Sequence, residues 1–475
     1  MSAAWRILVL AIALCIGAIA IFWRLTDASP FLDEGFTLWV GGQPVPQLLA
    51  LVASSDNSPP LFHLYTHALG WLHLHAWDYR WFCAPFGLVT IAASWGVAQR
   101  LFGDRAAAVA ALLTATSPLL VDWDRMYRMY APFVALSVLS WWLLVLVAER
   151  TQTKPPMWLA IAYVVIAACV PLLHYAGLLV VASQAAYAFA RRRTAWLALG
   201  ACALAAAGLL AWLPGMREQF ARGGSLVLSN QVYWLGAARN LFAPYLPTAA
   251  AQTRPTFDWL ITALALWIVA AALWIWRRTA LPFMVAPAIV QAAASALLGK
   301  DFVNPRYLLY VQPIFAVCTG AITAAQRTRF FGLAVAFAVL ACNVVGLQNL
   351  LLDPYYQRSD WYAVSALLVT QEHAGDAIVL DQGYMHYVVD DLNGFRGHAT
   401  FRVDSSESVR AFDAWLRARP TSRVWYVENQ FYYPDPQRAV FTTLRAHRLA
   451  LGTYEQKRRS PADAVAVVLF GPAER

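Results

Sequence analysis

Two adjacent carboxylates follow the first apolar segment of the chain, and their position makes them candidates for proton transfer. Asp33 and Glu34 are followed by Gly35 and by an amphipathic stretch at residues 36–40. A carboxylate held beside an acceptor hydroxyl can act as a general base. Acidic residues are also common at the start of a helix, where the helix dipole favours negative charge. A catalytic role and a structural role are therefore both open for this pair.

Two other groups of polar residues could bind an anion. The first lies between the third and fourth apolar segments and comprises Asp122, Asp124, Arg125, Tyr127, Arg128 and Tyr130. The second comprises Lys300, Asp301, Arg306 and Tyr307. A fixed guanidinium and a phenol can together hold a phosphate. Since Arg and Tyr also anchor helices at the membrane interface, anchoring is the alternative for both groups.

The histidines give weaker signals. His63 and His67 are four residues apart, so their imidazoles share one face of a helix and could bind a metal. Histidines near a membrane interface often bury part of the ring and keep their polar end in water without binding a metal, so no metal is assigned. A divalent cation remains an option, and no other cofactor is indicated. His174 and Tyr175 mark a further polar turn, for which a hydrogen-bonded structural pair is the simpler interpretation.

The elements that position these residues are predominantly apolar. The chain has 475 residues, of which 60% are hydrophobic and 13% charged, whereas soluble domains carry roughly 25% charged residues. Its net charge of +9 resides in short basic clusters between apolar segments, a pattern typical of cytoplasmic loops rather than of nucleic-acid binding. The six cysteines lie in apolar stretches without CxxC spacing, so no disulfide framework or cysteine-metal site is predicted.

Eleven apolar segments are predicted to cross the membrane, because a helical span needs about 17 to 25 mostly apolar residues. We read the first as an uncleaved anchor. Every compact basic cluster then falls on one side, which predicts a cytoplasmic amino end and an exterior carboxyl end. The stretch 59–77 is expected to lie in the headgroup region, within an exterior loop at residues 24–81. The predicted spans are residues 7–23, 82–99, 106–121, 130–148, 157–173, 176–190, 195–213, 258–276, 281–298, 308–324 and 330–350.

The composition changes at about residue 353 to that of a soluble domain. Two helices are predicted there, at residues 360–373 and 407–419, with strands at 376–381, 422–428 and 464–470. Alternating helices and strands predict a small α/β domain. The expected fold class is therefore a polytopic α-helical membrane protein, with a membrane domain at residues 1–352 and an exterior α/β domain at residues 353–475.

The order of these motifs resembles the GT-C glycosyltransferases, in particular the branch of the protein mannosyltransferases and lipid A aminoarabinose transferases. The resemblance runs through most of the chain, although each motif is short. The motifs that carry it are Asp33-Glu34 after the first span, Pro59-Pro60-Leu61 opening the interfacial helix, Arg128-Met129-Tyr130-Ala131, His174-Tyr175, Pro305-Arg306-Tyr307, and Asp360-Trp361 opening the exterior domain.

The resemblance implies transfer of a sugar from a polyprenyl-phosphate carrier to an acceptor on the exterior face, by a single inverting displacement. It implies Asp33 as the base beside Glu34, with the acid of the next exterior turn at Asp124. The residues that it assigns to substrate binding are Arg128, His174, Tyr175, Lys300, Arg306 and Tyr307. Relatives often carry Lys or His immediately before the double proline, where this chain has Asn57 and Ser58.

Three alternatives stay open. The chain could be a transporter or flippase of a lipid-linked sugar, although such proteins place polar groups near the middle of the bilayer. It could be an oligosaccharide ligase or polymerase of the same architecture, or a membrane-tethered binding protein. The expected location is a bacterial inner membrane with the site on the periplasmic side. Expected partners are the lipid-linked donor, membrane lipid, and a glycan, lipid or protein acceptor, without nucleic acid.

Overall fold

The computed structural model describes residues 2–148, 156–192, 194–222, 234–246, 254–299, 302–389, 399–430, 434–458 and 463–473. Lys300 lies outside these residues. The chain divides into two compact units, and each draws on two separate stretches of sequence. Unit 1 consists of Met1–Leu25 and Val40–Asn349, and unit 2 consists of Thr26–Trp39 and Leu350–Arg475.

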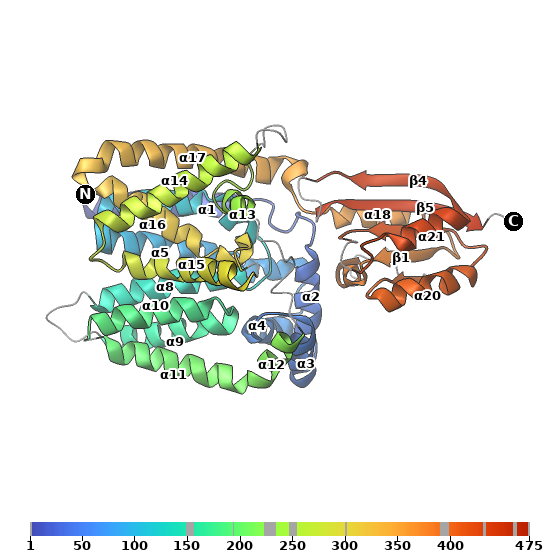
Figure 1. Cartoon of the computed structure of the whole chain (residues 1–475), viewed down its shortest axis with the longest axis horizontal. Coiled ribbons are helices and arrows are strands. Elements are labelled where there is room, and N and C mark those ends of the chain that lie inside the picture. The colour runs from blue at the N-terminus through green and yellow to red at the C-terminus, as the bar shows by residue number, and fades with distance from the viewer. Residues whose placement is uncertain are drawn as a thin grey trace. The chain divides into compact units, whose positions relative to one another are not determined.

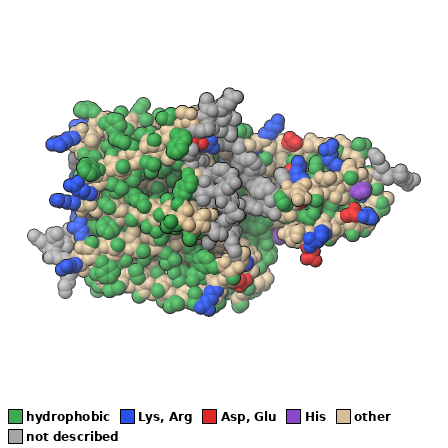
Figure 2. Space-filling view, in the orientation of Figure 1, with side chains coloured by type: hydrophobic (Ala, Val, Ile, Leu, Met, Phe, Trp, Pro, Cys, Tyr) green, Lys and Arg blue, Asp and Glu red, His purple; other side chains and the backbone are tan. Residues whose placement is uncertain are grey.

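Unit 1 is a bundle of helices (Figure 1). On the face shown in Figure 2, hydrophobic side chains cover the bundle, and several Lys and Arg side chains gather at the end where the amino terminus lies. The helices are α1 (Ala3–Phe22), α3 (Val45–Ser55), α4 (Leu61–Leu69), α5 (Pro85–Phe102), α6 (Asp104–Ala115), α7 (Pro118–Asp124), α8 (Tyr130–Ala148), α9 (Met157–Leu173), α10 (Gly177–Ala190), α11 (Ala195–Ala211), α12 (Leu213–Ala221), α13 (Trp234–Phe242), α14 (Arg254–Ile275), α15 (Leu281–Leu298), α16 (Val311–Ala324) and α17 (Arg329–Leu352).

The described helices are those of a multi-pass membrane protein. Six are long and apolar enough to cross a membrane, or up to eight if each of two bent helix pairs is one span. Each of the eleven predicted segments overlaps a helix or a bent pair, but α9, α10 and α16 are shorter than that test requires. The number of spans and their orientation therefore stay predictions. Helix α4, in the predicted interfacial stretch, has only 9 residues.

The bends and close contacts of the bundle come from proline and small residues. Between α6 and α7 the chain turns by 57°, because Pro118 cannot continue the hydrogen bonding of α6. The Asn343 amide then donates to the Leu113 carbonyl at 3.2 Å. Helices α6 and α16 pack so closely that a Cβ at Gly320 would lie 2.4 Å from the Ala106 carbonyl oxygen. Small residues thus bring helix backbones together, as is usual in membrane bundles.

Unit 2 is built around a five-stranded sheet of order β2-β1-β3-β5-β4. Strand β1 pairs in parallel with β2 and β3, whereas β5 is antiparallel to β3 and β4. Helices cover both faces of the sheet, and a separate apolar cluster fills each face. The elements are α18 (Trp361–Gln371), β1 (Ala377–Asp381), α19 (His386–Val389), β2 (Ala399–Arg402), α20 (Ser406–Arg417), β3 (Val424–Glu428), α21 (Ala439–His447), β4 (Arg448–Gln456) and β5 (Val465–Ala473).

The predicted C-terminal sheet is confirmed, with two more strands than the sequence indicated. Strand β2 is only 4 residues long, which is too short for a periodic pattern to stand out. Strand β4 is exposed along most of its length, so its residues lack the apolar alternation that marks a half-buried strand. Both lie at the edges of the sheet.

Helix α2 (Leu32–Gly41) begins in unit 2, although the sequence analysis assigned this stretch to the first domain. Leu32 lies in the same apolar cluster as Trp361 and other buried residues of the sheet. A Cβ at Gly35 would lie 2.5 Å from the Tyr387 carbonyl oxygen, and the ring of Phe36 packs against Tyr387 at 5.3 Å. Thr26–Trp39 is therefore a structural part of unit 2.

Candidate active site

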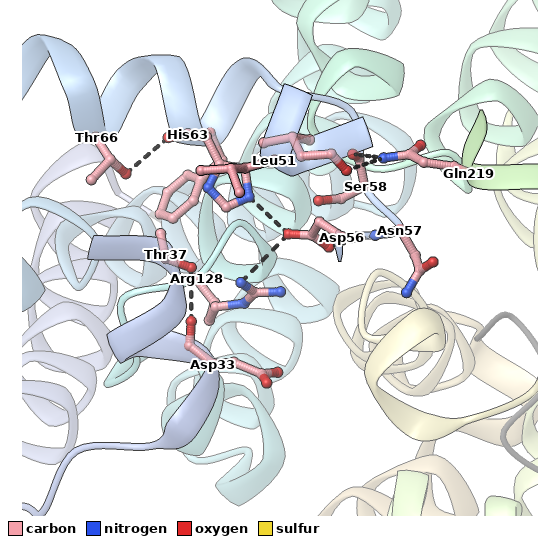
Figure 3. Close-up of polar contacts among 12 residues, drawn as sticks. Asp33, Thr37, Leu51, Asp56, Asn57, Ser58, His63, Thr66, Arg128 and Gln219 are labelled. Atoms are coloured by element: carbon pink, nitrogen blue, oxygen red, sulfur yellow. Dashed lines mark hydrogen bonds and ion pairs between the residues drawn. The ribbon is translucent and has the colours of Figure 1, made fainter. Parts of the chain in front are cut away.

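A buried carboxylate lies in the short loop between α3 and α4. Oδ2 of Asp56 is 2.7 Å from Nε2 of His63 and 3.8 Å from Nη1 of Arg128 (Figure 3). All three side chains are buried. Burial alone would raise the pKa of Asp56, but the positive charge of Arg128 and the hydrogen bond with His63 hold that pKa well below its usual range. Asp56 is therefore a permanent anion beside Arg128.

His174 joins this group to the turn that carries Arg306 and Tyr307. Its ring lies 5.6 Å from the ring of Tyr307 and 5.0 Å from that of Phe133. Burial, reinforced by the positive charges of Arg306 and Arg128, lowers the pKa of His174 to about 4. The ring is therefore neutral at neutral pH. Its Nδ1 accepts a hydrogen bond from the backbone N–H of Ala176 at 3.1 Å, so the ring proton is on Nε2, which can donate.

Arg306 and Tyr307 lie on a single 3-10 turn, Pro305–Leu308. The side chain of Asn304 caps this turn by accepting from the backbone N–H of Arg306 at 3.3 Å. Nη2 of Arg306 donates to the Tyr307 hydroxyl at 3.1 Å. The Gln291 amide of α15 donates to the carbonyls of Phe302 and Tyr307, at 2.6 and 3.4 Å. The turn that presents the guanidinium and the phenol is thus fixed by the buried side chain of Gln291.

Four of the predicted substrate-binding residues come together in unit 1, namely Arg128, His174, Arg306 and Tyr307. Tyr175 makes two hydrogen bonds within unit 1, and its role in substrate binding stays a prediction. Its hydroxyl donates to Oε1 of Gln219 at 2.6 Å and accepts from Nε1 of Trp212 at 3.0 Å. These bonds tie the turn after α9 to α12, as the structural alternative expects.

The acids near Arg128 pack against the bundle. Asp124 is buried at the end of α7, with Oδ2 so close to α5 that a Cβ at Gly87 would lie 2.4 Å away. Asp122 accepts a hydrogen bond from the Tyr245 hydroxyl at 2.7 Å. Arg125 donates to the backbone carbonyls of Ile21 and Trp23, at 3.1 and 2.6 Å. These contacts stabilise the helix ends, and the catalytic role of Asp124 stays a prediction.

The acidic pair lies at the start of α2, in unit 2. The carboxylate of Glu34 is completely buried and accepts from the backbone N–H of Phe31 at 2.9 Å, which caps the helix. The backbone carbonyl of Asp33 accepts from the Thr37 hydroxyl at 2.8 Å (Figure 3). Glu34 thus has a structural role of its own. Because Arg306 belongs to unit 1, convergence of Asp33 with Arg306 stays a prediction.

His63 and His67 do not point to a shared metal. His63 pairs with Asp56, whereas Nδ1 of His67 lies 3.0 Å from the Gly41 carbonyl oxygen. Within the described ranges, no group of three His, Cys, Asp or Glu side chains is arranged to hold a metal ion. The two imidazoles therefore serve separate contacts, and a metal stays unassigned.

Sequence reasoning missed Asp56, which directly precedes the Asn57-Ser58-Pro59-Pro60 stretch. The resemblance draws attention to Asn57 and Ser58, where relatives often carry Lys or His, and not to the residue before them. A carboxylate three residues before a double proline and seven positions ahead of a histidine is the signal that could have identified the pair. In the structure the loop folds back so that Asp56 faces the first turns of α4.

Comparisons with known proteins show which fold the chain has. The sequence profile of the dolichyl-phosphate-mannose-protein mannosyltransferases matches residues 57–215. A structure of ArnT from Cupriavidus metallidurans bound to undecaprenyl phosphate aligns with a TM-score of 0.53 and 14% identity, over 99% of this chain and 98% of that chain. The chain has a GT-C glycosyltransferase fold. The predicted resemblance to the GT-C superfamily is thereby confirmed.

The same GT-C fold is found in the oligosaccharyltransferase AglB from Archaeoglobus fulgidus. Its complex with an inhibitory peptide and a dolichol-phosphate aligns with a TM-score of 0.54 and 11% identity, over 99% of this chain and 76% of that chain. Its complex with Zn and sulfate has a TM-score of 0.57 and 12% identity, over 98% and 73%. A search of curated proteins finds no match.

Proposed function

We propose that this protein is a membrane glycosyltransferase that moves a sugar from a polyprenyl-phosphate carrier to an acceptor on the exterior face. In a bacterium this face would be the periplasmic side of the inner membrane. The observation that carries the proposal is the group formed by Arg128, Arg306, Tyr307 and neutral His174 in unit 1. It combines two guanidinium groups with two neutral hydrogen-bond donors, which is the chemistry that recognises a phosphate.

The charges of this group suit a phosphodiester. Arg128 and Arg306 supply two positive charges, and the buried Asp56 carboxylate offsets one of them. The resulting excess of one positive charge matches the single negative charge of a sugar phosphodiester. As the sugar leaves, the phosphate gains a second negative charge, which Arg306 and the donors around it would stabilise. The ArnT structure, bound to undecaprenyl phosphate, makes a polyprenyl phosphate the first candidate carrier.

The transfer itself is one displacement at the anomeric carbon. The acceptor hydroxyl gives its proton to the carboxylate of Asp33, and the acceptor oxygen forms a bond to that carbon. The bond from the same carbon to the phosphate oxygen breaks, and its electrons stay on the phosphate. The products are the inverted glycoside, protonated Asp33 and a polyprenyl phosphate with two negative charges. Since phosphate is a good leaving group, no general acid is needed.

The phosphate group is tested with undecaprenyl phosphate as the probe. Arg306→Ala and Arg128→Ala should each weaken its binding by about 10- to 100-fold, because a charge-assisted hydrogen bond is lost from a buried site. Binding is measured by native mass spectrometry of the detergent-solubilised chain. The matched control is Arg278→Ala, which removes an exposed guanidinium. Equal affinity of all four proteins would reject the phosphate assignment.

The base is tested with Asp33→Asn. This variant should bind undecaprenyl phosphate normally, yet release polyprenyl phosphate from a polyprenyl-phosphate sugar about 100- to 10,000-fold more slowly, because only the base is lost. A panel of such sugars with a membrane extract as acceptor source provides the assay. Unchanged release by Asp33→Asn would reject Asp33 as base. Transport of an intact lipid-linked sugar without release would favour the flippase alternative.

A further inference from the structure

A buried glutamine of α12 connects three parts of unit 1 that lie far apart in sequence. The Nε2 of Gln219 donates to the backbone carbonyls of Val52 and Ser58, both at 3.0 Å (Figure 3). Its Oε1 accepts from the Tyr175 hydroxyl at 2.6 Å. The side chain is almost fully buried. Both amide protons and the amide oxygen are thus engaged.

The bend between α11 and α12 gives Gln219 this position. The two helices meet at 67°, and Pro214 lies in the first turn of α12. One turn further along, Nη2 of Arg222 donates to the carbonyls of Ala53 and Asp56, at 2.6 and 2.9 Å. Gln219 and Arg222 therefore hold the loop that follows α3 on both sides of Asp56.

The fixed backbone determines where the Asp56 carboxylate can reach. Its Oδ2 meets the buried Nε2 of His63, and the same oxygen is the anionic neighbour of Arg128. A loop free to shift by an ångström or more would break the 2.7 Å contact with His63. It would also remove the carboxylate from Arg128, whose guanidinium then has a different electrostatic environment.

We infer that Gln219 is a positioning residue for donor recognition, acting through the loop backbone and Asp56 on the phosphate-binding guanidinium of Arg128. The effect on donor binding rests on the proposed function, whereas the effect on the loop does not. Glutamine suits this position because it supplies two N–H donors and one acceptor from a single neutral group. Leucine would supply none, and glutamate would retain the acceptor for Tyr175 while losing both N–H donors.

The first experiment measures undecaprenyl phosphate binding in a double-mutant cycle. Gln219→Leu and Gln219→Glu should each weaken binding by about tenfold, as expected when hydrogen bonds to a preorganised site are lost. In an Asp56→Asn background, the same substitutions should change binding by less than about threefold, because coupled residues are not additive. The matched control is Glu218→Leu, at the adjacent exposed position of α12. Additive effects of Gln219 and Asp56 would overturn the inference.

The second experiment reads the loop directly and needs no substrate. The imidazole nitrogens of His63 are observed by nitrogen NMR in the ¹⁵N-histidine-labelled chain and assigned with His63→Gln. Gln219→Leu should shift the Nε2 signal as its hydrogen bond to Asp56 weakens, whereas Glu218→Leu should not. An unshifted signal in a folded Gln219→Leu protein would overturn the inference. If that variant fails to fold, Gln219→Glu supplies the same measurement.

The two readouts separate this inference from the proposed function. If wild-type protein fails to bind undecaprenyl phosphate while the His63 signal responds to Gln219, the proposed carrier is wrong and the positioning of Asp56 stands. If the protein binds the probe, but neither its affinity nor the His63 signal changes when Gln219 is substituted, the positioning role is wrong and the proposed function stands.

Discussion

A single tyrosine hydroxyl lies between two buried carboxyl groups in the sheet of unit 2. The Tyr426 hydroxyl contacts Asp381 and lies 2.8 Å from Oε2 of Glu428, which Arg438 neutralises at 2.6 Å. One hydroxyl has only one proton to donate, so it cannot satisfy two carboxylates at once. Burial and the neighbouring carboxylates of Asp435 and Glu428 raise the pKa of Asp381 to about 7. Asp381 therefore keeps a proton in mildly acidic solution.

This raised pKa makes the stability of unit 2 depend on pH. A carboxyl whose pKa is higher in the folded state favours folding when protonated, and that contribution is lost as the pH rises. The pKa of Asp381 rises from the usual 3.8 to about 7 in the folded chain. Ionising it therefore lowers the free energy of unfolding by about 4 kcal/mol, at about 1.4 kcal/mol for each pH unit between the two pKa values. Asp381→Asn keeps a neutral group there. It should raise the unfolding temperature at pH 8 and change it little at pH 4, measured by differential scanning fluorimetry of the full chain. An equal effect at both pH values would contradict this assignment.

At the residue level, the sequence drew attention to the cations of the candidate site but not to its buried anion Asp56. Arg128, Arg306 and Tyr307 drew attention because polar and aromatic residues crowd two short turns between apolar segments. Asp56 could not be identified in this way, because it lies in a polar loop where a carboxylate is unremarkable. Its importance comes from burial beside His63, which only the folded chain shows. The buried carboxylate of Glu34 caps α2, and its predicted catalytic role stays a prediction.

At the level of elements, hydropathy located the helices but not their bends or contacts. Each predicted segment overlaps a helix because about 20 apolar residues have few alternatives in a bilayer. The 57° and 67° bends depend on single prolines whose effect on direction cannot be read from composition. The second bend matters most, since it turns α12 toward the loop after α3. Helix packing likewise depends on individual small residues.

Gly320 allows a prediction about one such contact. Gly320→Ala should lower the stability of the chain by about 1 to 3 kcal/mol, the usual cost of overpacking, because the new Cβ would meet the backbone of α6 2.4 Å away. Gly200→Ala is the matched control, since its Cβ would meet only the Val164 side chain at 3.5 Å. Thermal unfolding in detergent compares the two. A Gly320→Ala protein as stable as Gly200→Ala would show that α6 and α16 separate without cost.

At the level of the whole molecule, order along the chain did not predict which residues form one unit. The change in composition near residue 353 predicts the start of a C-terminal part, and the contacts divide the chain at Leu350. It could not show that Thr26–Trp39 belongs with it. Only packing reveals this, since Leu32 and Phe36 contact residues more than 300 positions away. Hydropathy compares neighbours in sequence and is insensitive to such pairs.

Leu32 provides the test of this division. Leu32→Ala should destabilise unit 2 by about 2 to 5 kcal/mol, because it leaves a cavity in a buried cluster. Hydrogen exchange measured by mass spectrometry should rise in α18 and β1 and stay unchanged in α8. Val45→Ala, at an exposed position of α3, is the control and should leave hydrogen exchange in α18, β1 and α8 unchanged. Faster exchange confined to α2 itself would argue against a shared core.

The membership of Thr26–Trp39 in unit 2 has a consequence for anyone who builds chimeras between this chain and its relatives. Replacing only the residues after Asn349 would leave this chain's own Leu32, Gly35 and Phe36 facing a foreign sheet with unmatched surfaces. A graft that carries both stretches would preserve the fit. Asp33, the proposed base, would then be exchanged together with unit 2, so such a swap would also replace the residue proposed to accept the proton.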